Sequence, residues 1–247
     1  MKNRFFFHCA YNGTSFLGWQ KQPNGITVQE TIETELGKLM SNKTVSIVGC
    51  GRTDAGVHAS SFYFHVDLDS TFTTDQLCYK LNNMMPSSIA IFQVKKVAES
   101  AHARFDAEKR TYRYFIHQNK DPFHQQDSWY YPKELDVKAM NKAAQLLLGK
   151  KDFTSFSKLH TDVKTNNCEV FYAEWQRDNN QLYFEISANR FLRNMVRAIV
   201  GTLLEVGRGE IQVTDVEKII KSKDRGKAGQ SVPAKGLFLT IIDYPYI

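Results

Sequence analysis

Cysteine is scarce in this sequence, and long apolar runs are missing. The chain of 247 residues has four cysteines, Cys9, Cys50, Cys78 and Cys168, and no two of them form a Cys-x-x-Cys pair. This excludes a zinc knuckle and a dithiol redox motif, and so few cysteines argue against a disulfide framework. No apolar run reaches about 18 residues, which argues against a transmembrane helix, and the apolar run near the N-terminus is too short for a signal peptide. We therefore expect a protein of the reducing cytoplasm.

Two common catalytic signatures are also missing. The glycine-rich residues 49–56 lack the Gly-Lys-Ser/Thr ending of a phosphate-binding loop, which disfavours a nucleotide-binding protein of that kind. No serine or cysteine stands in a nucleophile elbow, which disfavours an acyl hydrolase. His58 and His65 lack carboxylates at ligand spacing. We interpret them as ordinary loop and strand histidines and expect no metal site.

The composition is that of a soluble globular protein with an excess of basic charge. Hydrophobic residues make up 42% of the chain, charged residues make up 23%, and the net charge is +6. The length is sufficient for one large domain or two of ordinary size. The basic balance favours an anionic partner, with nucleic acid as the first candidate and a merely basic surface as the alternative.

The pattern of apolar residues predicts one order of elements that occurs twice. For the first half, we expect strands at residues 4–11, 45–48, 62–68 and 89–97, with helices beginning at Thr27 and Thr74. In the strand at 62–68, Phe62, Phe64, Val66 and Leu68 point to one face. Thr27 and Glu30 have the spacing of a capping box.

For the second half, we expect strands within residues 105–118 and at 169–177, 181–188 and 236–242, with a hairpin turn at 178–180. Helices are expected from Asp136 to a C-terminal Gly149, over 191–206 and over 213–222. The sequence thus predicts an α+β protein of two ferredoxin-like or RRM-like βαββαβ halves, residues 1–100 and 101–247, with mostly antiparallel sheets.

The segment at residues 49–59 is the most distinctive of the chain. It lies between two predicted strands, and its glycines allow a sharp bend or a close approach to a ligand. Arg52 and Asp54 stand within it, so it is a plausible place for chemistry. A glycine-rich turn capped by an aspartate is the alternative.

Two further segments combine basic and aromatic residues. In the strand around Arg110, Tyr112 and Tyr114, rings beside guanidinium groups suit unstacked bases and phosphates, and a core role for the tyrosines is the alternative. In the predicted helix at 191–206, Arg193 and Arg197 lie with the preceding Arg190 on one stripe near the N-terminus. Such arginines oppose the helix dipole and favour an anionic partner, with a solvated basic face as the alternative.

The segment Gly51-Arg52-Thr53-Asp54-Ala55-Gly56-Val57-His58-Ala59 resembles the signature of the TruA family of tRNA pseudouridine synthases. Further segments resemble the family in order along essentially the whole chain. They include Tyr11-Asn12-Gly13, Gly18-Trp19-Gln20, Val28-Gln29-Glu30, His102-Ala103-Arg104-Phe105, Tyr112-Arg113-Tyr114, Asp152-Phe153-Thr154-Ser155-Phe156, Met195-Val196-Arg197 and Gly236-Leu237-Phe238-Leu239. Asn12 stands where the family more often has Asp, and Lys235 falls in a variable segment. The departure at Lys235 leaves the catalytic set untouched.

The resemblance implies a role for each matching residue. Asp54 corresponds to the catalytic aspartate, Tyr112 to the active-site tyrosine, Arg197 to the arginine that pairs with the aspartate, Leu237 to the apolar residue beside the uracil, and Arg52 to a residue that holds the target nucleotide out of the stack. We expect Arg110 and Arg193, in the basic strand and helix, to contact phosphates.

The resemblance further implies a pseudouridine synthase fold with an active-site cleft between the two halves. The expected activity is isomerisation of uridine to pseudouridine in the anticodon stem-loop of tRNA, at positions 38, 39 or 40, by a homodimer. No redox change or external group is needed, so no cofactor is expected. A non-catalytic RNA-binding protein of the same fold is the alternative, and the intact Asp54, Tyr112 and Arg197 argue against it.

Overall fold

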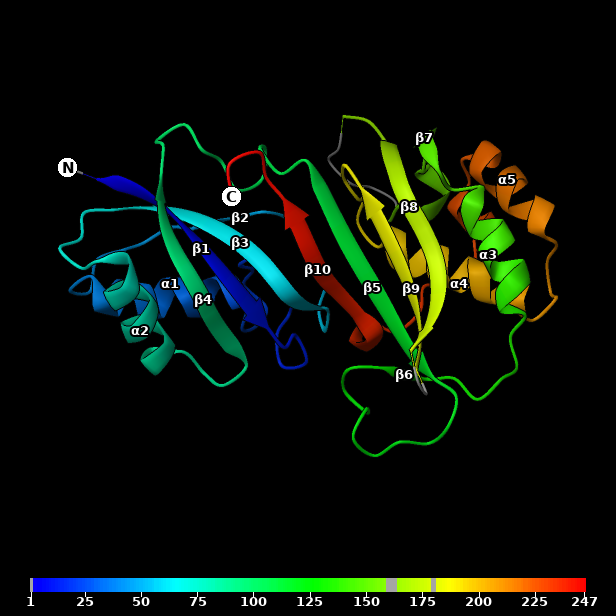
Figure 1. Ribbon diagram of the computed structural model, residues 1–247, viewed down its shortest axis with the longest axis horizontal. Helices are drawn as coiled ribbons and strands as arrows, with labels where there is room; N and C mark the ends of the chain where they lie inside the picture. Colours follow the sequence, from blue (N-terminus) through cyan, green and yellow to red (C-terminus); the bar gives the residue numbers. More distant parts are fainter. Residues whose placement is uncertain (1, 159–163, 179–180) are drawn as a thin grey trace. The chain divides into compact units, whose positions relative to one another are not determined.

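The computed structural model describes residues 2–158, 164–178 and 181–247. The chain divides into two compact units (Figure 1), of which unit 1 comprises Met1–Glu108 and Leu239–Ile247, and unit 2 comprises Lys109–Phe238. Residues 239–247, which lie in the predicted second half, therefore belong to unit 1. Each unit combines helices with strands that pair almost entirely antiparallel, which confirms the α+β class.

The sheet of unit 1 has the strand order β4-β1-β3, with the short β2 beside β3. Its strands are β1 (Asn3–Tyr11), β2 (Val48–Gly49), β3 (His58–Leu68) and β4 (Ile89–Val97). Strand β1 lies in the middle and pairs antiparallel with both β3 and β4. The predicted strands at 4–11, 62–68 and 89–97 are confirmed.

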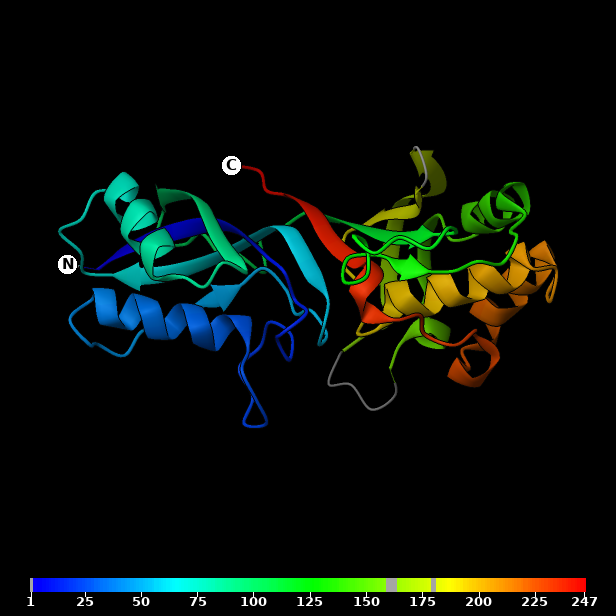
Figure 2. The ribbon, with the colours of Figure 1, turned by 90° about the horizontal axis from the view of Figure 1, so that it is seen from below.

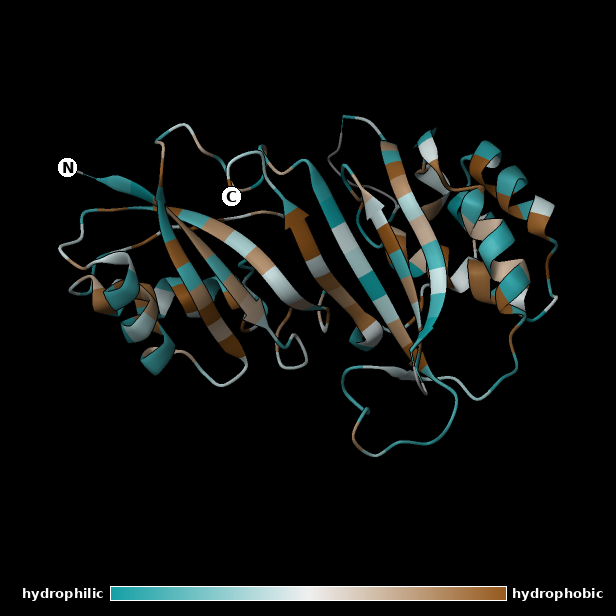
Figure 3. Cartoon of the chain, in the orientation of Figure 1, coloured by the Kyte–Doolittle hydropathy of each residue, from teal (hydrophilic) through white to brown (hydrophobic). Residues whose placement is uncertain are grey.

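Aromatic rings fill the core of unit 1. Phe62, Phe64, Val66 and Leu68 are all buried, as their alternation in β3 predicts. The rings of Phe7 and Phe64 stack with their centroids 4.8 Å apart, and those of Trp19 and Phe62 stack at 4.0 Å. Apolar and polar residues alternate along the strands in Figure 3. Burial of this aromatic surface supplies the main driving force for folding.

Two capped helices accompany this sheet. Helix α1 (Val28–Leu39) begins after Thr27, whose side chain accepts a hydrogen bond from the Glu30 amide, as predicted. Helix α2 (Thr74–Met84) begins one residue differently, because its cap is Thr73 and not Thr74. The reason is that only Thr73 has a glutamine three residues later, and Gln76 closes a full capping box with it.

The predicted strand at residues 45–48 is wrong in extent. Only Val48 and Gly49 pair with β3. The backbone of Ile47 is instead bound by side chains of α1, because its carbonyl accepts from Gln29 at 3.2 Å and its amide donates to Glu33 at 3.1 Å. These bonds satisfy the backbone groups that a strand partner would otherwise take.

The sheet of unit 2 has the order β5-β9-β8-β7, with β6 beside β5. Its strands are β5 (Lys109–His117), β6 (Trp129–Tyr130), β7 (Gly149–Asp152), β8 (Asn167–Asp178) and β9 (Gln181–Ala188). Among its described residues, β5 pairs antiparallel with β9, as do β9 with β8 and β8 with β7, whereas β5 and β6 run parallel. The predicted strands at 169–177 and 181–188 are confirmed, and β6 and β7 were not predicted. Two residues of the predicted hairpin turn, Asn179 and Asn180, lie outside the described residues.

Three α-helices gather beside β7 and β8 (Figures 1 and 2). They are α3 (Val137–Gln145), α4 (Met195–Gly207) and α5 (Val213–Ser222), accompanied by the short 3-10 helices η1 (Thr154–Phe156), η2 (Arg225–Lys227) and η3 (Ala234–Gly236). Asp136 caps α3 as predicted. The helix ends at Gln145, earlier than predicted, and Gly149 has a φ of 83° where the chain turns into β7.

Strand β10 (Leu237–Asp243) begins with the last two residues of unit 2 and continues in unit 1. In unit 1, the C-terminal residues cover the second face of β1, because Phe6 packs edge-on against the rings of Tyr244 and Tyr246. Among the described residues, no helix combines the length and apolar character needed to span a membrane.

Candidate active site

The loop that carries Arg52 and Asp54 lies between β2 and β3, and the end of β1 and the segment after it support this loop. The Tyr11 hydroxyl is 2.9 Å from the Thr53 hydroxyl in the buried interior, and the Trp19 amide donates to the Thr53 carbonyl at 3.3 Å. Gly18 has a φ of 86°, and a Cβ on it would lie 2.3 Å from the Thr53 carbonyl oxygen. Tyr11, Gly18 and Trp19 therefore fix the position of the loop at Thr53, directly before Asp54.

The far end of the loop is fixed in the same way. The Gly13 amide donates to Nδ1 of His58 at 3.1 Å, and a Cβ on Gly13 would lie 2.0 Å from the Val57 carbonyl oxygen. His58 is almost fully buried. The ring acts as a hydrogen-bond acceptor for the backbone, which agrees with its interpretation as a structural histidine.

Exposure alternates along the central residues of the loop. Arg52 is exposed, Thr53 is buried and Asp54 is half-buried. The Asp54 carbonyl accepts from the Val57 amide at 3.1 Å, which closes a turn directly after it. Thr53 thus anchors the loop, while Arg52 and Asp54 lie where a ligand can reach them.

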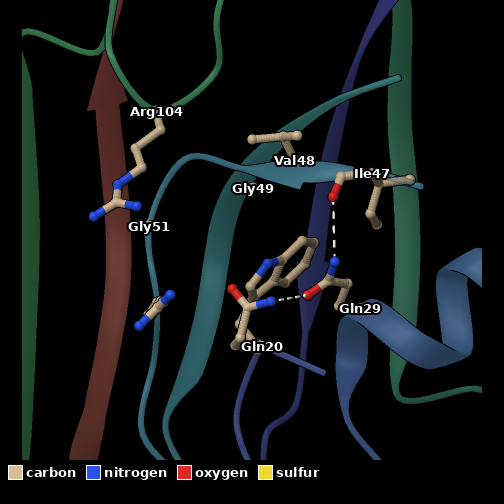
Figure 4. Close-up of a pocket in the computed structure, with 9 residues that line it drawn as sticks. Gln20, Gln29, Ile47, Val48, Gly49, Gly51 and Arg104 are labelled. Carbon is tan, nitrogen blue, oxygen red and sulfur yellow. Dashed lines mark hydrogen bonds between the residues drawn. The ribbon is translucent and has the colours of Figure 1, made fainter. Parts of the chain in front are cut away.

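A pocket of about 160 Å³ adjoins this loop (Figure 4). Gln29 forms one wall of it and is the centre of a hydrogen-bond network. Its Oε1 accepts from the Gln20 side chain at 2.8 Å and from the Lys21 amide at 3.0 Å, while its Nε2 donates to the Ile47 carbonyl. One buried amide therefore joins the segment after β1, helix α1 and the residues that lead into the loop. No local pattern in the sequence predicts this role of Gln29.

Tyr112 and Arg110 lie on β5 of unit 2. The Tyr112 ring meets the Phe191 ring edge-on, with centroids 5.1 Å apart, and the Arg110 guanidinium donates to the Asn189 carbonyl at 2.8 Å. Tyr114 is fully buried, and its hydroxyl donates to the Pro233 carbonyl at 2.8 Å. Burial raises the pKa of Tyr114 strongly. Tyr114 is a core residue, whereas Tyr112 is half-buried.

The prediction that Arg190, Arg193 and Arg197 share one helical stripe is wrong. Helix α4 begins at Met195, so only Arg197 lies within it. Asn194 has a φ of 67° and its side chain donates to Ser231 at 2.5 Å, while the Arg193 carbonyl accepts from the Lys158 amide at 3.0 Å. These long-range bonds hold the preceding residues out of the helix. Arg193 remains exposed.

Residues 232–237 support Arg197 and contain Leu237, two of the predicted site residues of unit 2. The Val232 carbonyl accepts from Nε of Arg197 at 2.7 Å, and the next carbonyl, that of Pro233, accepts from Tyr114. Buried Leu237 follows Gly236, where a Cβ would lie 2.9 Å from the Tyr114 ring. This short segment thus positions Arg197 and Leu237 against the strand that carries Tyr112.

The predicted site residues therefore form two sets. Arg52 and Asp54 lie together on one loop of unit 1, and Arg110, Tyr112, Arg193, Arg197 and Leu237 belong to unit 2. Within residues 2–158, 164–178 and 181–247, no group of three or more His, Cys, Asp or Glu side chains could hold a metal ion. The chemistry available at these residues is that of a carboxylate, a phenol and guanidinium groups.

Comparison with known proteins identifies the class. A family model described as tRNA pseudouridine synthase matches residues 143–245. A tRNA pseudouridine synthase A of Parabacteroides distasonis is 51% identical over 243 residues, which cover 98% of this chain and 96% of that protein. One of Bacteroides fragilis is 50% identical over 244 residues, with 98% and 96% covered. The chain therefore belongs to the tRNA pseudouridine synthase A family.

Among solved structures, a chain from the crystal structure of a Cbf5-Nop10-Gar1 complex matches with a TM-score of 0.37 and 14% identity. The match covers 81% of this chain and 45% of that one.

Proposed function

We propose that this protein isomerises uridine to pseudouridine in tRNA. The observation that carries the proposal is the anchored loop of unit 1, which presents Asp54 half-buried between two fixed points and next to an exposed arginine. The near-full-length identity to proteins named tRNA pseudouridine synthase A supports it. Within tRNA, we propose the anticodon stem-loop, at positions 38, 39 or 40, as the target.

The reaction breaks the bond between N1 of the uracil and C1′ of the ribose, turns the base, and joins C5 to C1′. The base first leaves its stack, at a cost of a few kcal/mol. We propose that the Asp54 carboxylate then acts on the sugar, either as a nucleophile at C1′ or by removing the 2′ proton. Both roles need the ionised carboxylate, and a cation such as Arg197 favours that form.

The other predicted residues complete the proposal. Tyr112 stacks on the uracil and helps to remove the C5 proton. Leu237 keeps water from the cleaved intermediate, and Arg52 holds the target nucleotide out of the stack. Arg110 and Arg193 contact phosphates, which makes binding depend on salt. The reaction needs no external group, so we propose that it proceeds without a cofactor, in the cytoplasm, in a homodimer.

The decisive experiment is tritium release from tRNA that carries uridine labelled at C5. The wild-type protein should release tritium, and Asp54→Asn should lower the rate by about 10³-fold or more while it still binds tRNA. Binding without release by the wild type would support the alternative, a non-catalytic RNA-binding protein. Undiminished release by Asp54→Asn would refute the role of the aspartate. Light scattering tests the homodimer, since it should report twice the mass of one chain.

A further inference from the structure

We propose that His102, Arg104 and Phe105 form an RNA-binding platform in unit 1, which stacks an unpaired base and holds a phosphate beside the Asp54 loop. The inference rests on the proposed function, because it names a further contact of the same RNA substrate. The platform lies in the turn between β4 and β5 and is distinct from the residues assigned to the reacting uridine.

Hydrogen bonds make this turn rigid before any ligand binds. Nδ1 of His102 accepts from the amides of Arg104 and Phe105 at 3.1 and 3.2 Å. The His102 amide donates to the Asp106 carboxylate at 2.7 Å. Ala103, which follows His102 in the turn, donates a hydrogen bond from its amide to Nδ1 of His65 at 3.1 Å. The turn loses little conformational freedom on binding, which favours affinity.

The turn holds an aromatic ring out into the solvent. Phe105 is 75% exposed, and its ring stacks on His102 with the centroids 4.2 Å apart and the planes 25° from parallel. The Arg104 guanidinium carbon lies 5.9 Å from the centre of the same ring. A single exposed phenylalanine is ordinary on protein surfaces. A ring that is backed by an imidazole and flanked by a guanidinium has the composition with which proteins stack unpaired bases and hold the adjoining phosphate.

Arg104 also connects the platform to the pocket at the candidate active site. Its side chain is directed toward the Gly51 end of that pocket in Figure 4, and Arg52 lines the same pocket. The nine residues that line it include two arginines and no carboxylate. Both arginines thus bring a guanidinium group to one small pocket, and guanidinium groups bind phosphate oxygens through parallel hydrogen bonds.

The dimensions of the pocket restrict the occupant. Its volume of about 160 Å³ is below the roughly 300–1,000 Å³ of sites for drug-sized ligands. A Cβ on Gly51 would meet no atom within 4 Å, so the backbone there is open to a close approach. A phosphate of the RNA backbone fits this combination of size, charge and open backbone, while the neighbouring base stacks on Phe105.

The experiment measures the affinity of the full-length protein for an anticodon-arm RNA hairpin as a function of salt. Phe105→Ala should weaken binding by about tenfold, and Phe105→Trp should retain it. Arg104→Ala should weaken binding and lower the slope of log affinity against log salt by about one. Tyr79→Ala is the matched control, because Tyr79 is a 70% exposed aromatic residue on α2. This variant should bind the hairpin as tightly as the wild type does.

Phe105→Leu separates stacking from packing, because leucine keeps apolar bulk without a π-face. It should bind as weakly as Phe105→Ala. The stacking role would be overturned if the RNA affinity of Phe105→Ala lay within twofold of that of the wild type. It would also be overturned if Phe105→Leu bound the RNA as tightly as Phe105→Trp does. An unchanged salt slope for Arg104→Ala would overturn the phosphate contact. Thermal unfolding verifies that each variant is folded. If Phe105→Ala does not fold, the RNA affinity of Phe105→Leu tests the stacking role in its place.

The two proposals fail separately. If the wild type releases no tritium from labelled tRNA, the proposed enzymatic function is refuted, whereas the RNA affinities of the Phe105 variants still test the platform. If the wild type is active and these variants bind normally, the platform alone is refuted.

Discussion

The hydroxyl groups of Tyr11 and Thr53 lie 2.9 Å apart in the buried interior of unit 1. This bond joins the end of β1 to the residue directly before Asp54, across 42 positions of the chain. It gives the loop a fixed point that no local sequence pattern supplies. Because catalysis depends on where the carboxylate lies to within about an ångström, the bond connects the packing of the core to the proposed chemistry.

Removal of the Tyr11 hydroxyl should therefore affect activity as well as stability. In Tyr11→Phe, the ring still packs on Phe62, with which the native ring makes an edge-on contact at 5.5 Å, and the hydrogen bond to Thr53 is lost. The free energy of unfolding should fall by about 1–3 kcal/mol, and single-turnover tritium release should slow by more than tRNA affinity falls. Urea unfolding, single-turnover kinetics and RNA binding measure the three quantities. Equal activity of variant and wild type would show that Thr53 needs no such anchor.

Substitution by alanine should destabilise the protein at Gly18 and leave its stability nearly unchanged at Gly51. Gly18→Ala places a Cβ 2.3 Å from the Thr53 carbonyl oxygen, at a residue with a φ of 86°. The backbone conformation alone should cost about 1–2 kcal/mol of stability, and the contact adds to it. Gly51→Ala meets nothing within 4 Å, so its melting temperature should stay within about 2 °C of the wild type.

The same pair tests the site as well as the fold. If an RNA phosphate approaches the backbone at Gly51, the stable Gly51→Ala variant should bind the anticodon-arm hairpin more weakly. A Gly51→Ala variant that unfolds like Gly18→Ala would contradict the open space at this position. Thermal unfolding and fluorescence anisotropy distinguish these results.

Substitution of Arg197 should mainly lower the catalytic rate, whereas substitution of Arg193 should mainly weaken tRNA binding. Arg197 uses its Nε to hold the Val232 carbonyl at 2.7 Å, and a lysine cannot reproduce the planar guanidinium geometry. Arg197→Lys should therefore lower kcat by about 10²-fold. Arg193→Ala removes an exposed side chain that precedes the helix. It should raise KM with kcat nearly unchanged and reduce the salt slope of tRNA binding by about one.

Steady-state kinetics at several salt concentrations measure both effects. A loss of kcat in Arg193→Ala, or an unchanged kcat in Arg197→Lys, would contradict these assignments.

His65 should make the protein less stable in mild acid. Burial, together with the charges of Arg4 and His102, lowers the pKa of His65 from 6.5 to about 4. Its Nδ1 accepts from the Ala103 amide, which requires that nitrogen to be unprotonated. The native state binds the proton less tightly than the unfolded chain does. The stability contributed by neutral His65 is therefore fully present above about pH 6.5 and is lost as the pH falls toward about 4.

The measurement is urea unfolding of wild type and His65→Asn between pH 7.5 and 4. Asparagine offers an oxygen near the position of Nδ1 and does not titrate. The difference in the free energy of unfolding between the two proteins should shift in favour of the variant as the pH falls. A difference that is independent of pH would show that His65 does not titrate in this range.

Short-range patterns determined much of this protein from the sequence by itself. The caps at Thr27 and Asp136 are contacts between residues three positions apart, and the alternation in β3 and the bounds of β4 and α5 follow the spacing of apolar residues along the chain. Both kinds of feature depend on local propensity and on the period of the apolar residues. The signature around Asp54 is a local pattern too, and it indicates the family without any knowledge of how the chain folds.

Only the tertiary structure decided the features that depend on distant residues. Side chains of α1 take the backbone groups of Ile47 and shorten β2, and the bond of Asn194 to Ser231 delays the start of α4. The anchor at Tyr11 and the support of Arg197 by Val232 join residues 42 and 35 positions apart. Hydrogen bonds over such separations are set by how the elements pack, which a local pattern does not contain.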